Sequence, residues 1–160
     1  MLDATGIPLF KLKANFNVPL LVMALVGFAG AVAGIFGTPA ETYVTVDLVK
    51  KVVSFLFTMY NIQFFFFPVF LTKRNFGDDV QVDMYHVFTA RVAGFLGGVL
   101  VAAYWYMEAS AAYTFISITV AGICLIGPVT GILFAGEGPD FPGGPIVMMI
   151  NGGLIAAALL

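Results

Sequence analysis

The stretch HVFTARVAGFLGGVLVAAYWYM, residues 86–107, decides the fold that this sequence predicts. A helix needs roughly 20 mostly apolar residues to cross the roughly 30 Å hydrocarbon core of a bilayer, and this stretch is long enough. Its only ionisable side chains besides tyrosine are His86 and Arg91, near its beginning. The stretch therefore predicts a transmembrane helix that carries an imidazole and a guanidinium near its N-terminal end.

Four further apolar runs flank this stretch, at residues 17–37, 52–71, 111–136 and 145–160. The first three also reach the length of a transmembrane helix. The last offers about 24 Å of helix at 1.5 Å per residue, which is short for a bilayer. For this run we expect either a chain that continues past Leu160 or a short helix half-buried in partners.

The composition makes the bilayer the expected solvent for the whole chain. Of the 160 residues, 61% are hydrophobic and 10% are charged, whereas soluble domains carry about 25% charged residues. Nine acidic residues against seven basic ones, with no basic run, give no electrostatic footprint for nucleic acid. The fold class predicted is an all-α integral membrane protein: one multi-pass domain, residues 1–160, with four to five transmembrane helices and short loops.

Proline and basic residues add detail to the expected helices. Pro128 should kink its run, whereas Pro68 falls where it would only loosen a last turn. Positive charge collects on the cytoplasmic, matrix or stromal side of a membrane, and the chain has more basic residues at one set of predicted span ends. The anchors expected on that side are Lys11, Lys13, Lys73, Arg74 and Arg91, against Lys50 and Lys51 on the other.

Small residues recur every four positions in the central stretch. The residues Ala90, Gly94, Gly98 and Ala102 would place one smooth stripe on its surface, and Gly30 and Gly34 repeat the spacing in the first run. Membrane helices associate through such small residues because their backbones can approach closely. We expect helix packing at these positions, with residues 86–107 as the tightest surface; flat seats for planar cofactors are the alternative.

Three polar residues at membrane depth are candidate cofactor ligands. The ring of His86, four residues before Ala90, could ligate the metal of a flat macrocycle. The amide oxygens of Asn61 and Gln63 could do the same, or could bond to neighbouring helices. The alternative for His86 is an interfacial, hydrogen-bonded imidazole. Arg91 would then anchor the topology, with Asp83 as its expected partner.

The segment ARVAGFLG, residues 90–97, resembles the arginine-containing helix of light-harvesting chlorophyll proteins. His86 stands five residues before Arg91, where that family has its ligating glutamate. The resemblance covers about a dozen residues. That family carries two such helices and this chain has one, so no family membership follows. Chlorophyll and carotenoid, besides lipids, are the cofactors this interpretation implies.

Together these patterns favour a non-catalytic accessory subunit of a larger membrane complex. The expected setting is photosynthetic or respiratory, in a thylakoid or mitochondrial inner membrane. The expected work is packing against other subunits and lipids, and binding pigment or lipid. The alternative is a small oligomeric channel or transporter. A third interpretation is a membrane enzyme with a cation held by Asp78, Asp79 and Asp83 in the loop TKRNFGDDVQVD.

Overall fold

The computed structural model describes residues 14–76, 81–134 and 143–160, and within them all regular structure is helical. This confirms the all-α prediction for the described part of the chain. In chain order the helices are α1 (Val18–Phe36), α2 (Val46–Phe66), α3 (Pro68–Phe76), α4 (Met84–Tyr106), α5 (Ala109–Cys124), the π-helical turn η1 (Leu125–Val129), α6 (Thr130–Phe134) and α7 (Gly143–Ala157).

Three of the described segments are long and apolar enough to cross a bilayer: α1, α4 and the continuous stretch Ala109–Leu133. The pair α2 and α3 would make a fourth, but only together, and the two helices are bent by 109°. Helix α7 has 15 residues and spans about 22 Å. The structure therefore has three to four candidate membrane spans, and the last predicted run forms a shorter apolar helix.

Polar side chains cap the N-terminal ends of three of these helices. Asn17, Thr45 and Asp83 each accept a hydrogen bond from a backbone N–H three residues later, at 3.1, 3.2 and 3.0 Å. Such caps satisfy donors that have no partner inside the helix. Helix α2 starts at Val46, before the apolar run of residues 52–71, because the cap at Thr45 sets where the helix begins.

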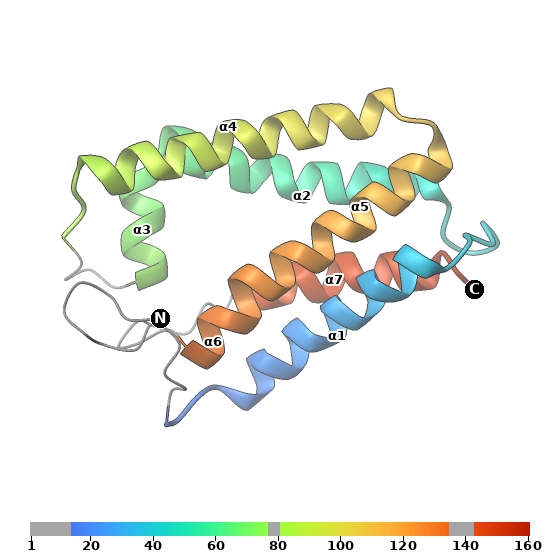
Figure 1. Ribbon diagram of the computed structural model, residues 1–160, viewed down its shortest axis with the longest axis horizontal. Coiled ribbons are helices and arrows are strands. Elements are labelled where there is room, and N and C mark those ends of the chain that lie inside the picture. Colours follow the sequence, from blue (N-terminus) through green and yellow to red (C-terminus); the bar gives the residue numbers. More distant parts are fainter. Residues whose placement is uncertain (1–13, 77–80, 135–142) are drawn as a thin grey trace.

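The break between α2 and α3 differs from the straight run predicted for residues 52–71. Pro68 has no N–H to continue the α2 ladder, and the chain turns at Phe67, where φ is −125° and ψ is 46°. Proline therefore ends one helix and begins the next, instead of loosening a last turn. In Figure 1, α3 runs nearly perpendicular to α2 and α4, across one end of the bundle.

Pro128 lies inside the π-helical turn η1, between α5 and α6. A π turn has wider spacing than an α-helix, which accommodates the lost hydrogen bond at a proline. The predicted distortion at Pro128 therefore takes the form of η1, and the segment remains a single candidate span.

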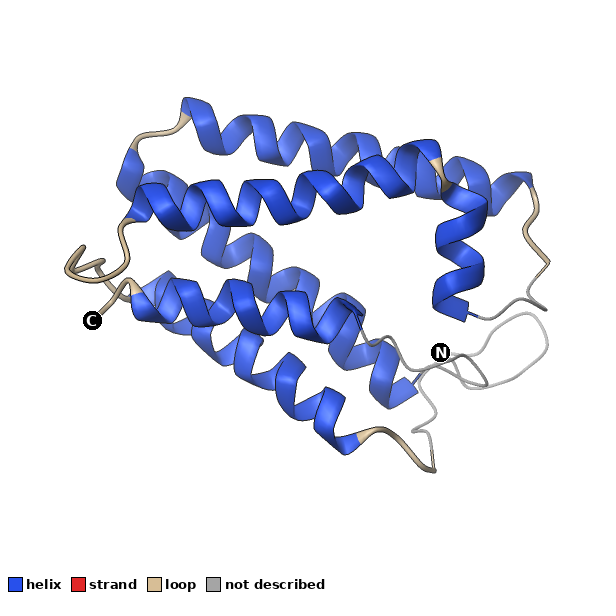
Figure 2. Ribbon diagram, turned by 180° about the vertical axis from the view of Figure 1, so that it is seen from behind, coloured by secondary structure: helices blue, strands red, loops and turns tan. Residues whose placement is uncertain are grey.

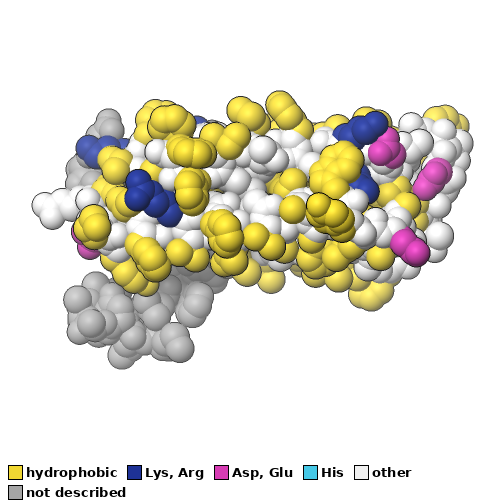
Figure 3. All heavy atoms as spheres, turned by 90° about the horizontal axis from the view of Figure 1, so that it is seen from above, with side chains coloured by type: hydrophobic (Ala, Val, Ile, Leu, Met, Phe, Trp, Pro, Cys, Tyr) yellow, Lys and Arg dark blue, Asp and Glu magenta, His cyan; other side chains and the backbone are white. Residues whose placement is uncertain are grey.

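The helices form two groups that share one core (Figures 1 and 2). Helices α1, α5 and α7 pack together, and α2 pairs with α4. The side chains between the groups include Val53, Phe57, Tyr104 and Ile116, all buried. Figure 3 shows the outer face of the α2 and α4 side as mostly hydrophobic, with basic side chains toward each end.

The closest helix–helix approach at the described glycines joins α1 to α7, backbone against backbone. A Cβ added to Gly27 would lie 2.6 Å from the carbonyl carbon of Met148, and one added to Gly152 would lie 2.6 Å from Cα of Gly27. One added to Gly30 would lie 2.7 Å from the carbonyl carbon of Gly152. Only glycine permits this contact, so the tightest surface is here and not on residues 86–107 as expected.

Gly34 leaves room for a three-helix junction further along α1. A Cβ at this position would lie 2.5 Å from Oγ of Ser117 and would also meet the side chain of Ile155. The hydroxyl of Tyr113 donates a 2.6 Å hydrogen bond to the carbonyl oxygen of Ile155. The expected packing positions Gly30 and Gly34 both lie in this α1, α5 and α7 group.

Candidate functional site

The predicted stripe of small residues on α4 does not pack along its whole length against one neighbouring helix. A straight α-helix turns about 100° per residue, so each step of four residues drifts by about 40°. From His86 to Ala102 the drift reaches about 160°. A Cβ at Gly94 would lie 2.9 Å from the backbone oxygen of Asn61 on α2, whereas a Cβ at Gly98 would meet nothing within 4 Å. Gly94 is thus a packing position within this chain, and Gly98 and the exposed Ala102 are not.

Gly97, which the four-residue spacing passes over, completes the contact between α4 and α2. A Cβ at Gly97 would lie 2.7 Å from Cγ of Asn61. The Nδ2 atom of Asn61 is buried, and it has no hydrogen-bond partner within the described residues. The structure therefore places the candidate ligand Asn61 between the two helices, with one polar atom unsatisfied.

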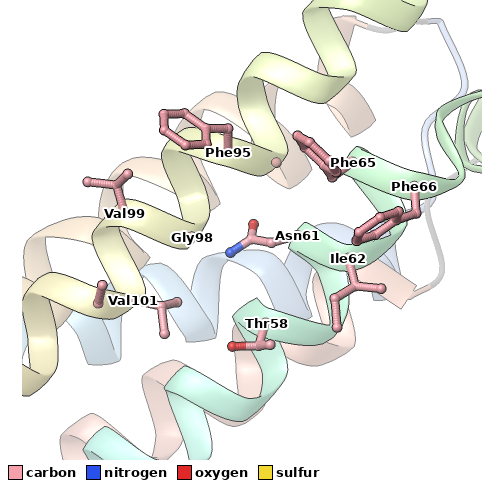
Figure 4. A pocket seen from close by; sticks show the side chains of 11 residues that line it. Thr58, Asn61, Ile62, Phe65, Phe66, Phe95, Gly98, Val99 and Val101 are labelled. Atoms are coloured by element: carbon pink, nitrogen blue, oxygen red, sulfur yellow. The ribbon is translucent and has the colours of Figure 1, made fainter.

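Beside this contact, an open apolar groove of about 540 Å³ lies between α2 and α4. Its walls are formed by Ile62, Phe65 and Phe66 on α2 and by Phe95, Val99 and Ala102 on α4. Gly98 leaves the floor clear, and Asn61 supplies a polar group at its side. Figure 4 shows Asn61 extending from α2 toward α4 near Gly98, with the rings of Phe65 and Phe95 toward one end.

Gln63, the second candidate amide ligand, is bonded to its own helix. Its Nε2 donates a 3.0 Å hydrogen bond to the backbone oxygen of Met59, one turn earlier in α2. Gln63 does not line the groove. The amide therefore satisfies part of its hydrogen-bonding capacity within α2, and the structure does not bring it to Asn61.

His86 lies in the first turn of α4 and pairs with Asp83, the residue that caps this helix. The Nδ1 atom of His86 is 2.7 Å from Oδ1 of Asp83, and both side chains are exposed. This pairing replaces the expected one between Asp83 and Arg91. The physical reason is distance: Arg91 is eight residues from Asp83, about 12 Å along the helix, whereas His86 is within one turn.

His86 and Asn61 are far apart. Asn61 contacts α4 at Gly97, eleven residues after His86, which is about 16 Å along the helix axis. The stripe of small residues that follows His86 is also free for only a short distance, because α2 covers it at Gly94. The three candidate ligands therefore do not form one cofactor site, and each must be considered alone.

The described basic residues divide between the two ends of the α2, α3 and α4 unit, with Lys73, Arg74 and Arg91 toward one end and Lys50 and Lys51 toward the other. Lys73 and Arg74 lie in the last turn of α3, and Arg91 lies in the first third of α4. Lys50 is at the opposite end, where its Nζ lies 5.0 Å from the ring centroid of Trp105. The predicted orientation stays a prediction, because the described basic residues divide three to two between the ends and Lys11 and Lys13 lie outside the described residues.

The proposed cation loop is described only at its edges. Asp78 and Asp79 fall outside the described residues, and Asp83 is occupied by the cap and by His86. No group of three or more His, Cys, Asp or Glu side chains suited to a metal occurs within residues 14–76, 81–134 and 143–160.

The pairing of Asp83 gives a pH-dependent prediction. The backbone N–H and then the ring N–H of His86 hold the pKa of the Asp83 carboxyl below its ordinary value. A carboxyl with a depressed pKa contributes stability above its unfolded pKa of about 3.9, and this contribution is lost as pH falls through the lower folded value.

In His86→Ala we expect the pKa of Asp83 to rise and still to remain below its ordinary value, because the backbone N–H donor is kept. Carboxyl ¹³C NMR titration of the protein in micelles measures this, and Asp83→Asn assigns the signal by removing it. An unchanged pKa in His86→Ala would show that the ring does not bond to Asp83.

No protein-family model, curated protein or solved structure matches this chain. Its function must therefore be argued from its own residues.

Proposed function

We propose that this chain is a non-catalytic, multi-pass subunit of a larger membrane assembly, and that it packs against other subunits and holds lipid or pigment. Its candidate spans would cross an energy-converting membrane, such as a thylakoid or mitochondrial inner membrane. The photosynthetic or respiratory setting belongs to this proposal and draws on the composition and on the short likeness around Arg91.

The observation that carries the proposal is the outer flank of α2 and α4. Large apolar side chains stand exposed along its length, among them Phe55 and Phe66 on α2 and Phe88, Phe95 and Leu96 on α4. Soluble monomers rarely expose apolar patches of this extent, so such a flank indicates contact with lipid or another protein. Lipid tails and neighbouring apolar helices are both suitable cover for it.

His86 supports the pigment part of the proposal. With Nδ1 engaged by Asp83, its Nε2 is the nitrogen left for a metal. A carboxylate that holds the other ring nitrogen is the usual companion of a metal-bound histidine, because it fixes the ring and raises its basicity. A magnesium macrocycle that takes one axial ligand suits a single exposed histidine.

The test is purification of the native protein from its own membrane in mild detergent. We expect it to migrate with other subunits, well above its own 17.1 kDa, and to carry pigment bands in the absorption spectrum. If pigment is present, His86→Leu should remove one pigment and leave the fold intact. A colourless protein that associates only with itself would contradict the proposal and favour the oligomeric channel or transporter.

A further inference from the structure

We propose that the groove between α2 and α4 binds one acyl chain of an anionic glycerolipid, whose headgroup is held by Arg91. The inference rests on the membrane location in the proposed function and adds a defined site, ligand and orientation to it.

The groove has the size and lining of a ligand site. Its volume of about 540 Å³ lies within the 300–1,000 Å³ typical of small-molecule sites. Phenylalanine rings stand on both sides, at Phe65 and Phe95, and Gly98 leaves the space between them open. An open groove with aromatic walls suits a flexible hydrocarbon chain better than a second helix, which packs most closely on surfaces of small residues.

Arg91 lies on the groove-lining face of α4. It precedes Gly98 by seven residues, so the two positions differ by only about 20° around the helix. It precedes Phe95 by one turn. Arg91 is exposed, and it makes no ion pair or hydrogen bond with any residue in the part of the chain that the structure describes. The groove therefore continues toward a positive charge that has no ion-pair partner among the described residues.

The position of Arg91 along α4 matches the orientation of a lipid. Arg91 is about 10 Å from the start of the helix at Met84, so its long stem can reach the headgroup region. From Arg91 to Ala102 the groove face extends about 16 Å, comparable to half of the roughly 30 Å hydrocarbon core. A headgroup at the membrane surface and one chain directed inward would thus fill this face.

The charges favour an anionic headgroup over a zwitterionic one. A guanidinium pairs with phosphate oxygens in a two-pronged geometry, and an unpaired cation at this depth is costly. Asp83, the acidic residue that caps α4, is already held by His86. The Nδ2 of Asn61, which is buried and has no hydrogen-bond partner within the described residues, is a further donor beside the groove.

The experiment reconstitutes the full chain into vesicles of equal parts phosphatidylcholine and phosphatidylglycerol. The protein is then extracted in mild detergent, and retained lipid is counted by native mass spectrometry. We expect one retained phosphatidylglycerol per chain, preferred over phosphatidylcholine by about fivefold, the effect of one basic side chain near an anionic group.

Two substitutions separate the tail from the headgroup. Gly98→Leu places a branched side chain in the groove, at a position where a Cβ would meet no atom within 4 Å, and it should abolish retention of both lipids. Gly153→Leu, whose Cβ would also lie in open space but on α7, should behave as the unaltered protein. Arg91→Gln should keep retention and lose the preference for phosphatidylglycerol, and Arg91→Lys should keep part of it.

Three results would overturn the inference: no anionic preference in the unaltered protein, equal lipid retention in Gly98→Leu, or an unchanged anionic preference in Arg91→Gln. Flotation of the vesicles distinguishes failure of the membrane location from failure of the lipid site. A protein that does not float with the vesicles contradicts the proposed function itself, whereas one that floats but retains no lipid contradicts the lipid site alone.

Discussion

Gly152→Ala is expected to destabilise the protein by about 1–3 kcal/mol, the usual cost of adding a methyl group to a fully packed site. The new Cβ would lie 2.6 Å from the backbone of Gly27, which belongs to a helix and cannot move aside. Helices α1 and α7 would have to separate along their whole contact. A clash with a flexible side chain could be relieved by a change of rotamer, but here the clashing atoms of Gly27 are backbone atoms, so the loss of stability should be larger.

The neighbouring residue provides a matched control. Gly153→Ala places the same methyl group in open space on the same helix, and alanine favours a helix over glycine by up to about 1 kcal/mol. We therefore expect Gly153→Ala to leave stability unchanged or slightly raised.

The chain contains its own reporter for this comparison. Cys124 is the only cysteine and is buried in the core, so a thiol-reactive dye labels it only when the bundle opens. The rate of labelling during a denaturant titration in detergent gives the midpoint for each variant. Equal midpoints for the two alanine variants would refute the backbone contact between α1 and α7.

Asn151→Leu is expected to change stability in the opposite direction, raising it by about 1–3 kcal/mol. Asn151 on α7 is 0% exposed, and neither Oδ1 nor Nδ2 has a hydrogen-bond partner within the described residues. An unsatisfied buried polar group costs about this much, and leucine has a similar branched shape without polar atoms.

The same thiol-labelling titration measures the effect. Asn151→Asp is the control of opposite sign, because it would place a charge at the same site, and it should lower the midpoint. If Asn151→Leu also lowers the midpoint, the amide has a partner that stabilises the protein, and the interpretation of Asn151 as an uncompensated polar group is wrong.

The sequence predicts the helices of this fold well and their contacts poorly. Apolar length locates α1, α4 and α5, because a bilayer-length run has few other structures available to it. The break at Phe67 is harder to foresee: a proline can loosen, kink or end a helix, and the packing of α3 against α4 decides among these.

The candidate site shows the same limit at the level of single residues. A spacing of four identifies Gly94 but also selects Gly98, where an added Cβ would meet nothing within 4 Å, and it omits Gly97, which contacts Asn61. The sequence contains the period of a helix but not the direction of its partner, and a 40° drift per step is enough to change which glycine is covered. That α2 covers Gly97 and leaves Gly98 open could be known only from the position of α2.

The contact of α1 with α7 also bears on the order in which the helices can pair during synthesis. These are the first and last described helices, and the glycines that join them are separated by most of the sequence. During translation, the glycine face of α1 has its partner only after α7 has been synthesised, whereas α2 and α4 can already pair. Contacts between such distant segments form late and leave surfaces open to incorrect pairing in the meantime.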